Sequence, residues 1–404
     1  MRIHWNRLFK RDGKLMKPID EVLLSSPYFI SLRHDFHAHP ELGLNEFRTS
    51  RIIAEELTKM GYSVTRNIAK TGLVATLKRG ESERSIGIRA EMDALPIKEK
   101  SELPYRSKHD GIMHACGHDG HVATLLCAAH ALATRKKFDG TVHLIFQPAE
   151  ENAGGAQLMV QEGLFKDFPC DFVFAMHNDP LLPFGKLAWR YGPIMAAVDS
   201  VKVLIKGRGG HEGMPHLAAD PIIAGSAIIM ALQTIVSRNI DPCDPAILSI
   251  GSFHSGTTSG IIPEEAEIEI GLRSVSDKTR NQLEERLKFL IHNQATSFGV
   301  DAEVDVERWY GPTVNNDKAV DTLVNVAKVL FGDENLIELE KSFMLAEDFS
   351  YMLDTCRGAY FFIGGATGEG DYPLHHPSYN FNDNIVKLGA MLWTNLVESY
   401  LKMP

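Results

Sequence analysis

Cysteine is scarce in this chain of 404 residues, and the five that occur are scattered along it. They are Cys116, Cys127, Cys170, Cys243 and Cys356. Small disulfide-stabilised folds instead carry closely spaced, even-numbered sets of cysteines. The pattern therefore excludes a disulfide framework, and we expect a protein of the reducing cytoplasm.

Basic residues are also in short supply, since 42 lysines and arginines stand against 52 aspartates and glutamates. A nucleic-acid partner is not expected, because no basic surplus exists to neutralise phosphates. Long hydrophobic runs are missing too. The longest, residues 221–236, carries Gly225 and Gln233 and is too short and too polar for a membrane span. The basic N-terminus, residues 1–17, lacks the apolar centre of a signal peptide.

Three histidines, a cysteine and an aspartate occur within nine residues, in the stretch MHACGHDGH at 113–121. Imidazole, thiolate and carboxylate are the side chains that bind transition metals well. Helical spacing of apolar residues begins directly afterwards, so we expect a helix N-terminus here with Asp119 as the N-cap. That position also favours a thiolate at Cys116. A solvated polar loop is the alternative, but the density of potential ligands favours a metal site.

Five short apolar runs of strand length alternate with helical patterns, at residues 72–77, 85–90, 141–146, 172–176 and 358–363. This alternation predicts an α/β fold with a mixed, mostly parallel sheet flanked by helices. Several runs are followed by acids or histidines, namely Asp93, Glu150, Glu151 and His177. Ligands bind beyond the carboxyl ends of strands in open α/β sheets. We therefore expect these residues and the 113–121 stretch to converge on one rim.

The chain is too long for one ordinary core, and its pattern changes from residue 200. Strands are expected at 200–206, 246–253, 264–273 and 300–308, with helices at 219–238 and 277–297. The order β-α-β-β-α-β is that of the ferredoxin-like motif. We predict an inserted α+β domain at residues 198–311, within a discontinuous catalytic domain formed by residues 1–197 and 312–404.

The potential ligands at the rim are too many for one tetrahedral zinc ion: Cys116, His118, Glu150, Glu151, His177 and His375. Two divalent ions with a bridging water use such a set better. Adjacent carboxylates on a turn point in different directions, so one can bind metal while the other acts as a general base. A pair of acids at a helix N-terminus would be the interpretation if Glu150 and Glu151 stood alone. Beside the histidines and cysteine, the pair predicts metal-assisted hydrolysis of an amide or ester.

Two other histidines, His34 and His37, could share one face of a helix predicted at residues 31–37. No acid or cysteine cluster joins them locally, so we expect structural or surface roles for both. A second helix is predicted at residues 46–60, closed by Gly61.

Five motifs occur in an order that resembles a known family: RAEMDALP at 89–96, MHACGHD at 113–119, FQPAEE at 146–151, GGH at 209–211 with PH at 215–216, and EDFS at 347–350. Together they are similar to the bacterial and plant amidohydrolases that include hippurate hydrolase, indole-acetyl-amino-acid hydrolases and N-acetyl-diaminopimelate deacetylase. That group is a branch of the dinuclear aminoacylase–carboxypeptidase metallopeptidases. The likeness covers residues 32–383.

The resemblance implies a role for each matched position. It makes Glu150 the general acid–base and Asp93 a residue that orients a ligand. The implied metal ligands are Cys116, His118, Glu151, His177 and His375. The last is preferred over His376 because the family's ligand stands two residues before a proline, as His375 does before Pro377. The inserted domain would be a lid that also dimerises, with His211 contacting substrate.

The sequence departs from the family at two positions. Glu91 stands where the family usually has aspartate, and Gly260 where it usually has an asparagine whose amide holds the substrate. The second departure bears on the substrate rather than on the hydrolytic chemistry. Arg273, at the end of a lid strand, could grip a substrate carboxylate instead. A surface arginine at a strand end is the alternative interpretation.

The sequence therefore predicts a cytoplasmic, homodimeric, metal-dependent amidohydrolase that splits N-acyl amino acids into an acid and a free amino acid. Zinc or manganese is the expected metal, with cobalt or nickel possible, and neither a membrane nor a nucleic acid is an expected partner. A dipeptidase or carboxypeptidase of the same clan is the nearest alternative enzyme. A non-catalytic metal-binding relative is the alternative from another class, but a metal buffer does not require Glu150 beside Glu151.

Overall fold

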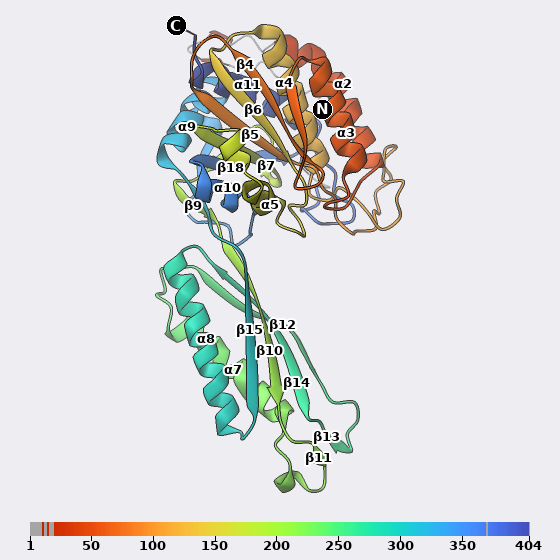
Figure 1. Cartoon of the computed structure of the whole chain (residues 1–404), viewed down its shortest axis with the longest axis vertical. Helices are drawn as coiled ribbons and strands as arrows, with labels where there is room; N and C mark the ends of the chain where they lie inside the picture. The colour runs from red at the N-terminus through yellow and green to blue at the C-terminus, as the bar shows by residue number, and fades with distance from the viewer. Residues whose placement is uncertain (1–9, 12–13, 16–19, 369–370, 404) are drawn as a thin grey trace. The chain divides into compact units, whose positions relative to one another are not determined.

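The computed structural model describes residues 10–11, 14–15, 20–368 and 371–403 (Figure 1). The chain divides into two compact units. Unit 1 comprises Met1–Ile194, Val314–Lys341 and Tyr351–Pro404, and unit 2 comprises Met195–Thr313 and Ser342–Ser350. The basic N-terminal segment, residues 1–17, lies outside the described residues except for β1 (Lys10–Arg11) and β2 (Lys14–Leu15).

An eight-stranded sheet forms the framework of unit 1, in the order β17-β8-β18-β7-β5-β6-β4-β3. Four adjacent strands run parallel: β18 (Gly358–Ala366), β7 (Phe172–Pro183), β5 (Ser85–Glu91) and β6 (Gly140–Gln147). They contain four of the predicted apolar runs. Strands β5, β6 and β18 and the first seven residues of β7 are almost wholly buried, as strands covered on both faces are. The fifth run lies in β4 (Gly72–Arg79), which pairs antiparallel with β6. The predicted fold class is confirmed.

The edges of this sheet were not predicted from the sequence. They are β3 (Ser63–Ile68) on one side and β8 (Leu187–Trp189) with β17 (Leu336–Glu338) on the other. A separate two-stranded ribbon pairs β9 (Gly192–Met195) with β16 (Thr313–Asn315). The edge strands are short or largely exposed, so they lack the apolar runs that identified the central strands.

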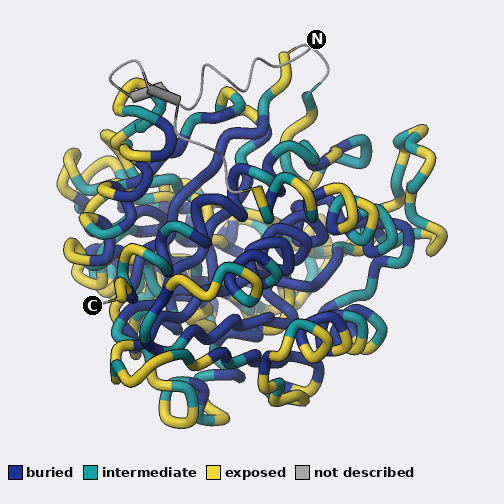
Figure 2. The backbone as a smooth tube through the Cα atoms, turned by 90° about the horizontal axis from the view of Figure 1, so that it is seen from above, coloured by how far each residue is buried: buried dark blue, intermediate teal, exposed yellow. Residues whose placement is uncertain are grey.

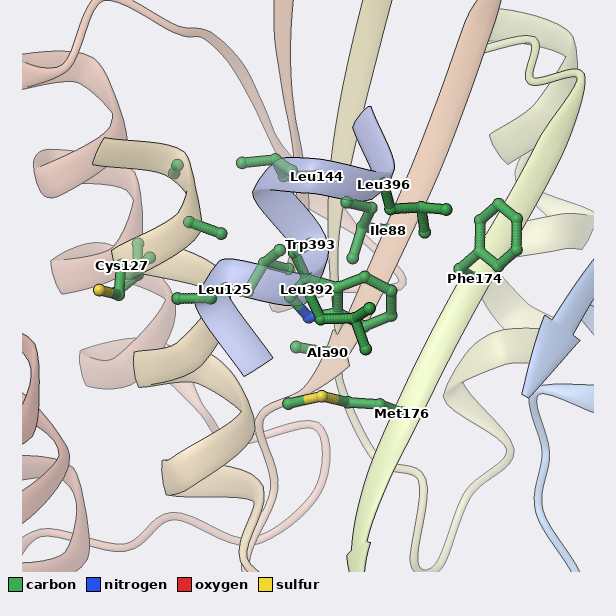
Figure 3. Close-up of a cluster of buried hydrophobic side chains, with 14 of the residues drawn as sticks. Ile88, Ala90, Leu125, Cys127, Leu144, Phe174, Met176, Leu392, Trp393 and Leu396 are labelled. Atoms are coloured by element: carbon green, nitrogen blue, oxygen red, sulfur yellow. The ribbon is translucent and has the colours of Figure 1, made fainter. Parts of the chain in front are cut away.

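Helices cover the sheet of unit 1: α2 (Asp20–Ala38), α3 (Phe47–Lys59), α4 (His118–Arg135), α9 (Asp317–Phe331) and α11 (Asn384–Tyr400). Shorter helical segments are α5 (Gly155–Gln161), α6 (Leu164–Asp167), α10 (Ser350–Thr355) and the 3-10 turn η2 (Asp333–Asn335). Helix α2 begins well before the predicted position and packs against α4, which also packs against α11. In Figure 3, Leu125 of α4 and Trp393 of α11 lie with Ile88 of β5 in the buried core.

Unit 2 has the predicted β-α-β-β-α-β order: β10 (Ala197–Lys206), α7 (Pro221–Arg238), β12 (Ala246–Ser255), β14 (Glu265–Ser274), α8 (Asp277–Ser297) and β15 (Asp301–Tyr310). The antiparallel sheet order is β12-β14-β10-β15. Burial alternates strictly along β14, because one face of the sheet packs on α7 and α8 while the other is exposed. A ribbon of β11 (Gly210–His211) and β13 (Ile261–Ile262) and the 3-10 turn η1 (Pro215–Leu217) complete the unit.

Helix α7 is long and apolar enough to cross a membrane by length and composition alone, contrary to the expectation from its small and polar residues. One side of it is buried in the core of unit 2, through Ala224, Ile228, Leu232 and Ile235. Packing on a sheet requires that apolar side.

The contrast between buried and exposed residues holds across the chain. Figure 2 shows long stretches of buried residues, with exposed residues concentrated at turns.

Candidate metal and catalytic site

Four segments of unit 1 supply the side chains of the predicted metal site. His118 is the first residue of α4, and Cys116 lies two residues before it. Glu151 follows the end of β6, and His177 lies within β7. His375 lies in the loop between β18 and α11. The carboxyl end of β6, the middle of β7 and a helix N-terminus thus meet. The predicted strand ending at residue 176 was wrong, because β7 continues past His177 to Pro183.

The structure brings all five predicted ligands together. Ligand atoms of Cys116, His118 and Glu151 lie within 4.8 Å of one another. The Cys116 Sγ lies 3.3 Å from Nε2 of His177, and the Glu151 Oε1 lies 3.3 Å from Nε2 of His375. Nitrogen, sulfur and oxygen donors in one cluster suit a divalent transition metal such as zinc.

The neighbouring His376 is placed differently from His375. Its ring stacks on Tyr372, and its Nδ1 accepts a hydrogen bond from the backbone N–H of Ser378. His375 has a left-handed backbone (φ 64°), and its N–H donates to the carbonyl of Ala115, which ties the loop to the 113–121 stretch. His375 therefore lies beside Glu151, whereas His376 stacks on Tyr372.

Asp93 contacts two of the predicted ligands without joining them in the cluster. Its Oδ1 lies 3.1 Å from Nδ1 of His118, and its Oδ2 accepts a hydrogen bond from the backbone N–H of Glu151 at 2.9 Å. Among the described residues, Nε2 of His118 has no hydrogen-bond partner. A carboxylate that holds one imidazole nitrogen while the other stays free is the usual arrangement behind a metal-bound histidine. The residues present therefore fit a metal.

Protonation in this cluster depends on burial. Burial raises the pKa of the Cys116 thiol, and the charges of Glu151 and Glu150 raise it further. The predicted effect of the helix N-terminus on this thiol is therefore outweighed. Burial also lowers the pKa of His177 to about 3, whereas for His118 the hydrogen bond to Asp93 overcomes burial and raises the pKa to about 10. A divalent cation would supply the positive charge that a thiolate needs here.

Glu150 is buried beside Glu151 in the turn after β6. The preceding residue, Ala149, has a left-handed backbone (φ 50°) and donates its N–H to the carboxylate of Glu46. Non-glycine residues in this conformation persist where surrounding contacts impose it, often at functional sites. The turn therefore fixes where the two adjacent carboxylates lie.

The N-cap of α4 is Gly117 rather than the predicted Asp119. Gly117 has φ 94°, and a Cβ there would lie 2.4 Å from Asn178 Oδ1 and 2.7 Å from the Tyr379 hydroxyl. Only glycine meets both demands. Asp119 is instead buried, and its Oδ2 accepts hydrogen bonds from Arg33 and His37.

His34 and His37 contact acids outside the proposed metal site: His37 contacts Asp119, and His34 contacts Asp383. His37 is buried, whereas His34 pairs with Asp383 at 2.9 Å and stacks on Tyr105. The expectation of structural roles therefore agrees with their contacts. The acids that satisfy them come from distant parts of the chain, which a local search could not reveal.

Sequence reasoning gave no role to His121, although it belongs to the 113–121 stretch. It is buried one helical turn after His118, and its Nδ1 lies 2.9 Å from Oε2 of Glu91. Ligand-type atoms of Glu91, His118, His121 and His177 also lie within 4.8 Å of one another. The i, i+3 spacing from His118 was the available signal, because such residues share a helix face.

The predicted substrate-binding residues belong to unit 2. His211 is exposed in β11, and its Nδ1 accepts a hydrogen bond from the N–H of Gly213. Arg273 lies near the end of β14 between Val198 and Ile247, where burial lowers its pKa. Gly260 precedes β13, and among the described residues beyond its two chain neighbours no atom lies within 4 Å of the position that a Cβ would take.

The model of the Peptidase family M20/M25/M40 matches residues 87–399. The chain belongs to this family. The family match confirms the resemblance inferred from the motifs and places the chain among the hydrolases. The matched range begins after the N-terminal segment, residues 1–17.

Similar proteins match almost the whole of this M20 chain. The hippurate hydrolase of Campylobacter jejuni is 42% identical over 387 residues, which cover 96% of this chain and 100% of that protein. Thermostable carboxypeptidase 1 of Saccharolobus solfataricus is 37% identical, with coverage of 94% and 96%. The crystal structure of a dinuclear metal-binding M20 peptidase from Bacillus subtilis matches with a TM-score of 0.81 at 30% identity, covering 94% of this chain and 99% of that one.

Proposed function

We propose that this protein hydrolyses the amide bond of N-acyl amino acids, releasing a carboxylic acid and a free amino acid. The observation that carries the proposal is the convergence of Cys116, His118, Glu151, His177 and His375 beside Glu150 in one M20 chain. The similarity to a hippurate hydrolase along the full length supports this substrate class. A metal store would not need a buried second carboxylate next to a ligand.

Two divalent ions, zinc or manganese, would be held by those five side chains. When bound, they would polarise the acyl carbonyl and acidify a water molecule. Glu150 accepts the proton of the attacking water and returns it to the leaving nitrogen, so that water and amide become acid and amine. Asp93 accepts a hydrogen bond from Nδ1 of His118, which orients the ring and leaves Nε2 available to a metal.

The first test is catalytic. The purified protein, supplied with zinc, manganese or cobalt, is assayed on N-acetyl and N-benzoyl amino acids for release of free amino acid. Glu150→Gln preserves the shape of the side chain and removes its basicity, so we expect a loss of about 10²–10⁴-fold in kcat with metal content unchanged. Near-normal turnover in this variant would assign the proton transfer to another group.

The second test concerns stoichiometry. Elemental analysis of an active preparation should give two divalent ions per chain, and chelation should abolish activity that added metal restores. Full activity with one ion per chain would contradict the dinuclear site.

A carboxypeptidase or dipeptidase is the second candidate function, favoured by the similarity to a thermostable carboxypeptidase. The same metal site would serve it, because both reactions hydrolyse an amide next to a carboxylate-bearing residue. Comparing kcat/KM for N-benzoylglycine with that for glycyl dipeptides and blocked peptides separates the two. A preference for peptides by tenfold or more would replace the proposed substrate class.

The proposed role of unit 2 is that of a lid and dimerisation domain, with His211 and Arg273 binding the substrate. We place the second copy of the chain against the exposed Ile223 and Met230 of α7, because patches of exposed apolar residues mark interaction sites. A reducing cytoplasm is the proposed location, since Cys116 must stay a free thiol to bind metal.

A further inference from the structure

The buried ring of His121 lies against two of the proposed metal ligands. Its centroid is 4.6 Å from that of His177, with the rings at 76°, and 5.6 Å from that of His118. This edge-on contact restricts the movement of the His177 ring on one side. The position of His121 therefore bears directly on where the ring of His177 can lie.

Both nitrogens of His121 face other protein groups in this arrangement. Its Nδ1 lies 2.9 Å from Oε2 of Glu91, and its Nε2 lies 2.8 Å from Oδ1 of Asn178. His177 differs, because its Nδ1 donates to the backbone carbonyl of Asn178 at 2.8 Å while its Nε2 points to Cys116. Asn178 thus holds one ring through its side chain and the other through its main chain.

Glu91 and Asn178, which contact His121, are themselves held by other buried side chains. Glu91 forms an ion pair with Arg89, and the Nε of Arg89 donates to Oε1 of Gln147 at 2.8 Å. The Nδ2 of Asn178 lies 2.6 Å from the Tyr379 hydroxyl. These groups are buried, and Glu91, Gln147 and Asn178 come from adjacent strands of the sheet. Fixed strands leave the hydrogen-bonded side chains little freedom to move.

We propose that Glu91, His121 and Asn178, here termed the His121 network, are positioning residues that fix the orientation of His177 and thereby set the metal affinity of the site. The inference rests on the proposed metal site. Groups that orient metal-bound histidines typically change metal affinity by about 10–100-fold when they are removed. The glutamate at position 91, where aspartate is usual in the resembled family, supplies the reach to His121.

The test measures metal binding and not turnover. His121→Phe keeps a ring of similar size against His177 but removes both hydrogen bonds, and Glu91→Gln removes the charge that holds Nδ1. The matched control is His143→Phe, a buried histidine of β6 whose Nδ1 pairs with Thr76 at 2.9 Å and which belongs to neither cluster. Each metal-free protein is titrated with Co²⁺, with the cobalt absorption spectrum and chelator competition as readouts.

We expect His121→Phe and Glu91→Gln to bind Co²⁺ about 10–100-fold more weakly than the unaltered protein, with a changed cobalt spectrum, and the control to bind normally. Circular dichroism and thermal unfolding establish that each variant is folded. If His121→Phe does not fold, Glu91→Gln alone decides the outcome. Normal affinity in the folded variants would overturn the network while leaving the metal site intact. Absence of Co²⁺ binding by the unaltered protein would overturn the metal site, and the network with it.

Discussion

Single residues around Asp119 show how a buried charge is satisfied beside the proposed metal site. The Oδ2 of Asp119 accepts from Nη1 of Arg33 at 3.1 Å and lies 2.9 Å from Nδ1 of His37. Burial would raise the pKa of this carboxyl, but His37 and Arg33 hold it well below its usual range. Removing one partner of such a buried group typically destabilises a protein by about 3–5 kcal/mol. The cluster thus anchors the first turn of α4, which carries His118.

His37 should make the free energy of unfolding depend on pH in the neutral to alkaline range. Burial alone would lower its pKa, but the hydrogen bond and charge of Asp119, with Glu99, raise the pKa from 6.5 to about 9. Because the folded pKa is the higher one, the stabilisation is fully present below about pH 6.5 and is lost as pH rises through 9. A rise of this size corresponds to about 3 kcal/mol.

The measurement is the free energy of unfolding between pH 6 and 10, for the unaltered protein and for His37→Gln. The difference between them should shrink as pH rises. His143→Gln is the control above about pH 7.5, because burial lowers the pKa of folded His143 to about 4 and the unfolded imidazole, with a pKa near 6.5, is also neutral there. A difference that stays constant with pH would assign the role of His37 to packing.

At the residue scale, the sequence pointed to side chains that lie together where the potential ligands are close along the chain, and it missed contacts whose partners are distant. Cys116, His118 and the Glu150–Glu151 pair stood out because ligand types cluster along the chain. The N-cap at Gly117 was missed. Asn178 and Tyr379 leave no space for a side chain at this position, and both are distant in sequence. The link between Glu91 and His121 was missed for the same reason.

At the level of elements, α4 and α11 of unit 1 pack closely at Gly389. A Cβ on Gly389 of α11 would lie 2.6 Å from Cγ2 of Thr124 and 2.7 Å from the terminal methyl of Met176. Thr124 is held in place because its hydroxyl donates to the carbonyl of Gly120 at 2.7 Å. Glycine is therefore required for contact here, although it lowers the intrinsic stability of the helix.

Gly389→Ala should destabilise the protein. Alanine gains about 1 kcal/mol in helix propensity, but overpacking of a core costs about 1–3 kcal/mol, so a net loss of up to about 2 kcal/mol is expected in urea unfolding. Thr124→Ser removes the clashing methyl and keeps the hydroxyl. The double variant should recover much of the loss, and failure to recover it would place the strain elsewhere.

The strand order of unit 2 was predictable and its exact membership was not. Alternating burial and the order β-α-β-β-α-β follow from local periodicity in residues 200–310. The segment Ser342–Ser350 joins this unit through a pairing of Met195 with Phe343. Such a pairing depends on the folded chain and leaves no periodic pattern in the sequence.

For the whole molecule, the proposed dimer gives a direct test of α7. Met230 is 70% exposed, and a charge there would have to be buried in an interface. Met230→Asp should therefore convert the dimer to monomers in light scattering. The control is Leu24→Asp on α2 of unit 1, an apolar residue that is also largely exposed and should leave the dimer intact. A dimer that survives Met230→Asp would place the interface elsewhere.

The last prediction concerns His211, to which the resemblance gives a substrate contact and which we propose acts in the active site of the neighbouring subunit. Stabilising the developing oxyanion from that position would require a residue exposed on its own chain, and His211 is exposed. His211→Ala should lose activity while keeping its metals. Mixing it with Glu150→Gln, after dissociation and reassociation of subunits, tests whether the histidine acts across the dimer. Random pairing makes half of the dimers mixed, and each mixed dimer contains one site with both groups, so about a quarter of the original activity should return. If mixed dimers form and no activity returns, His211 acts within its own chain or has no part in the reaction.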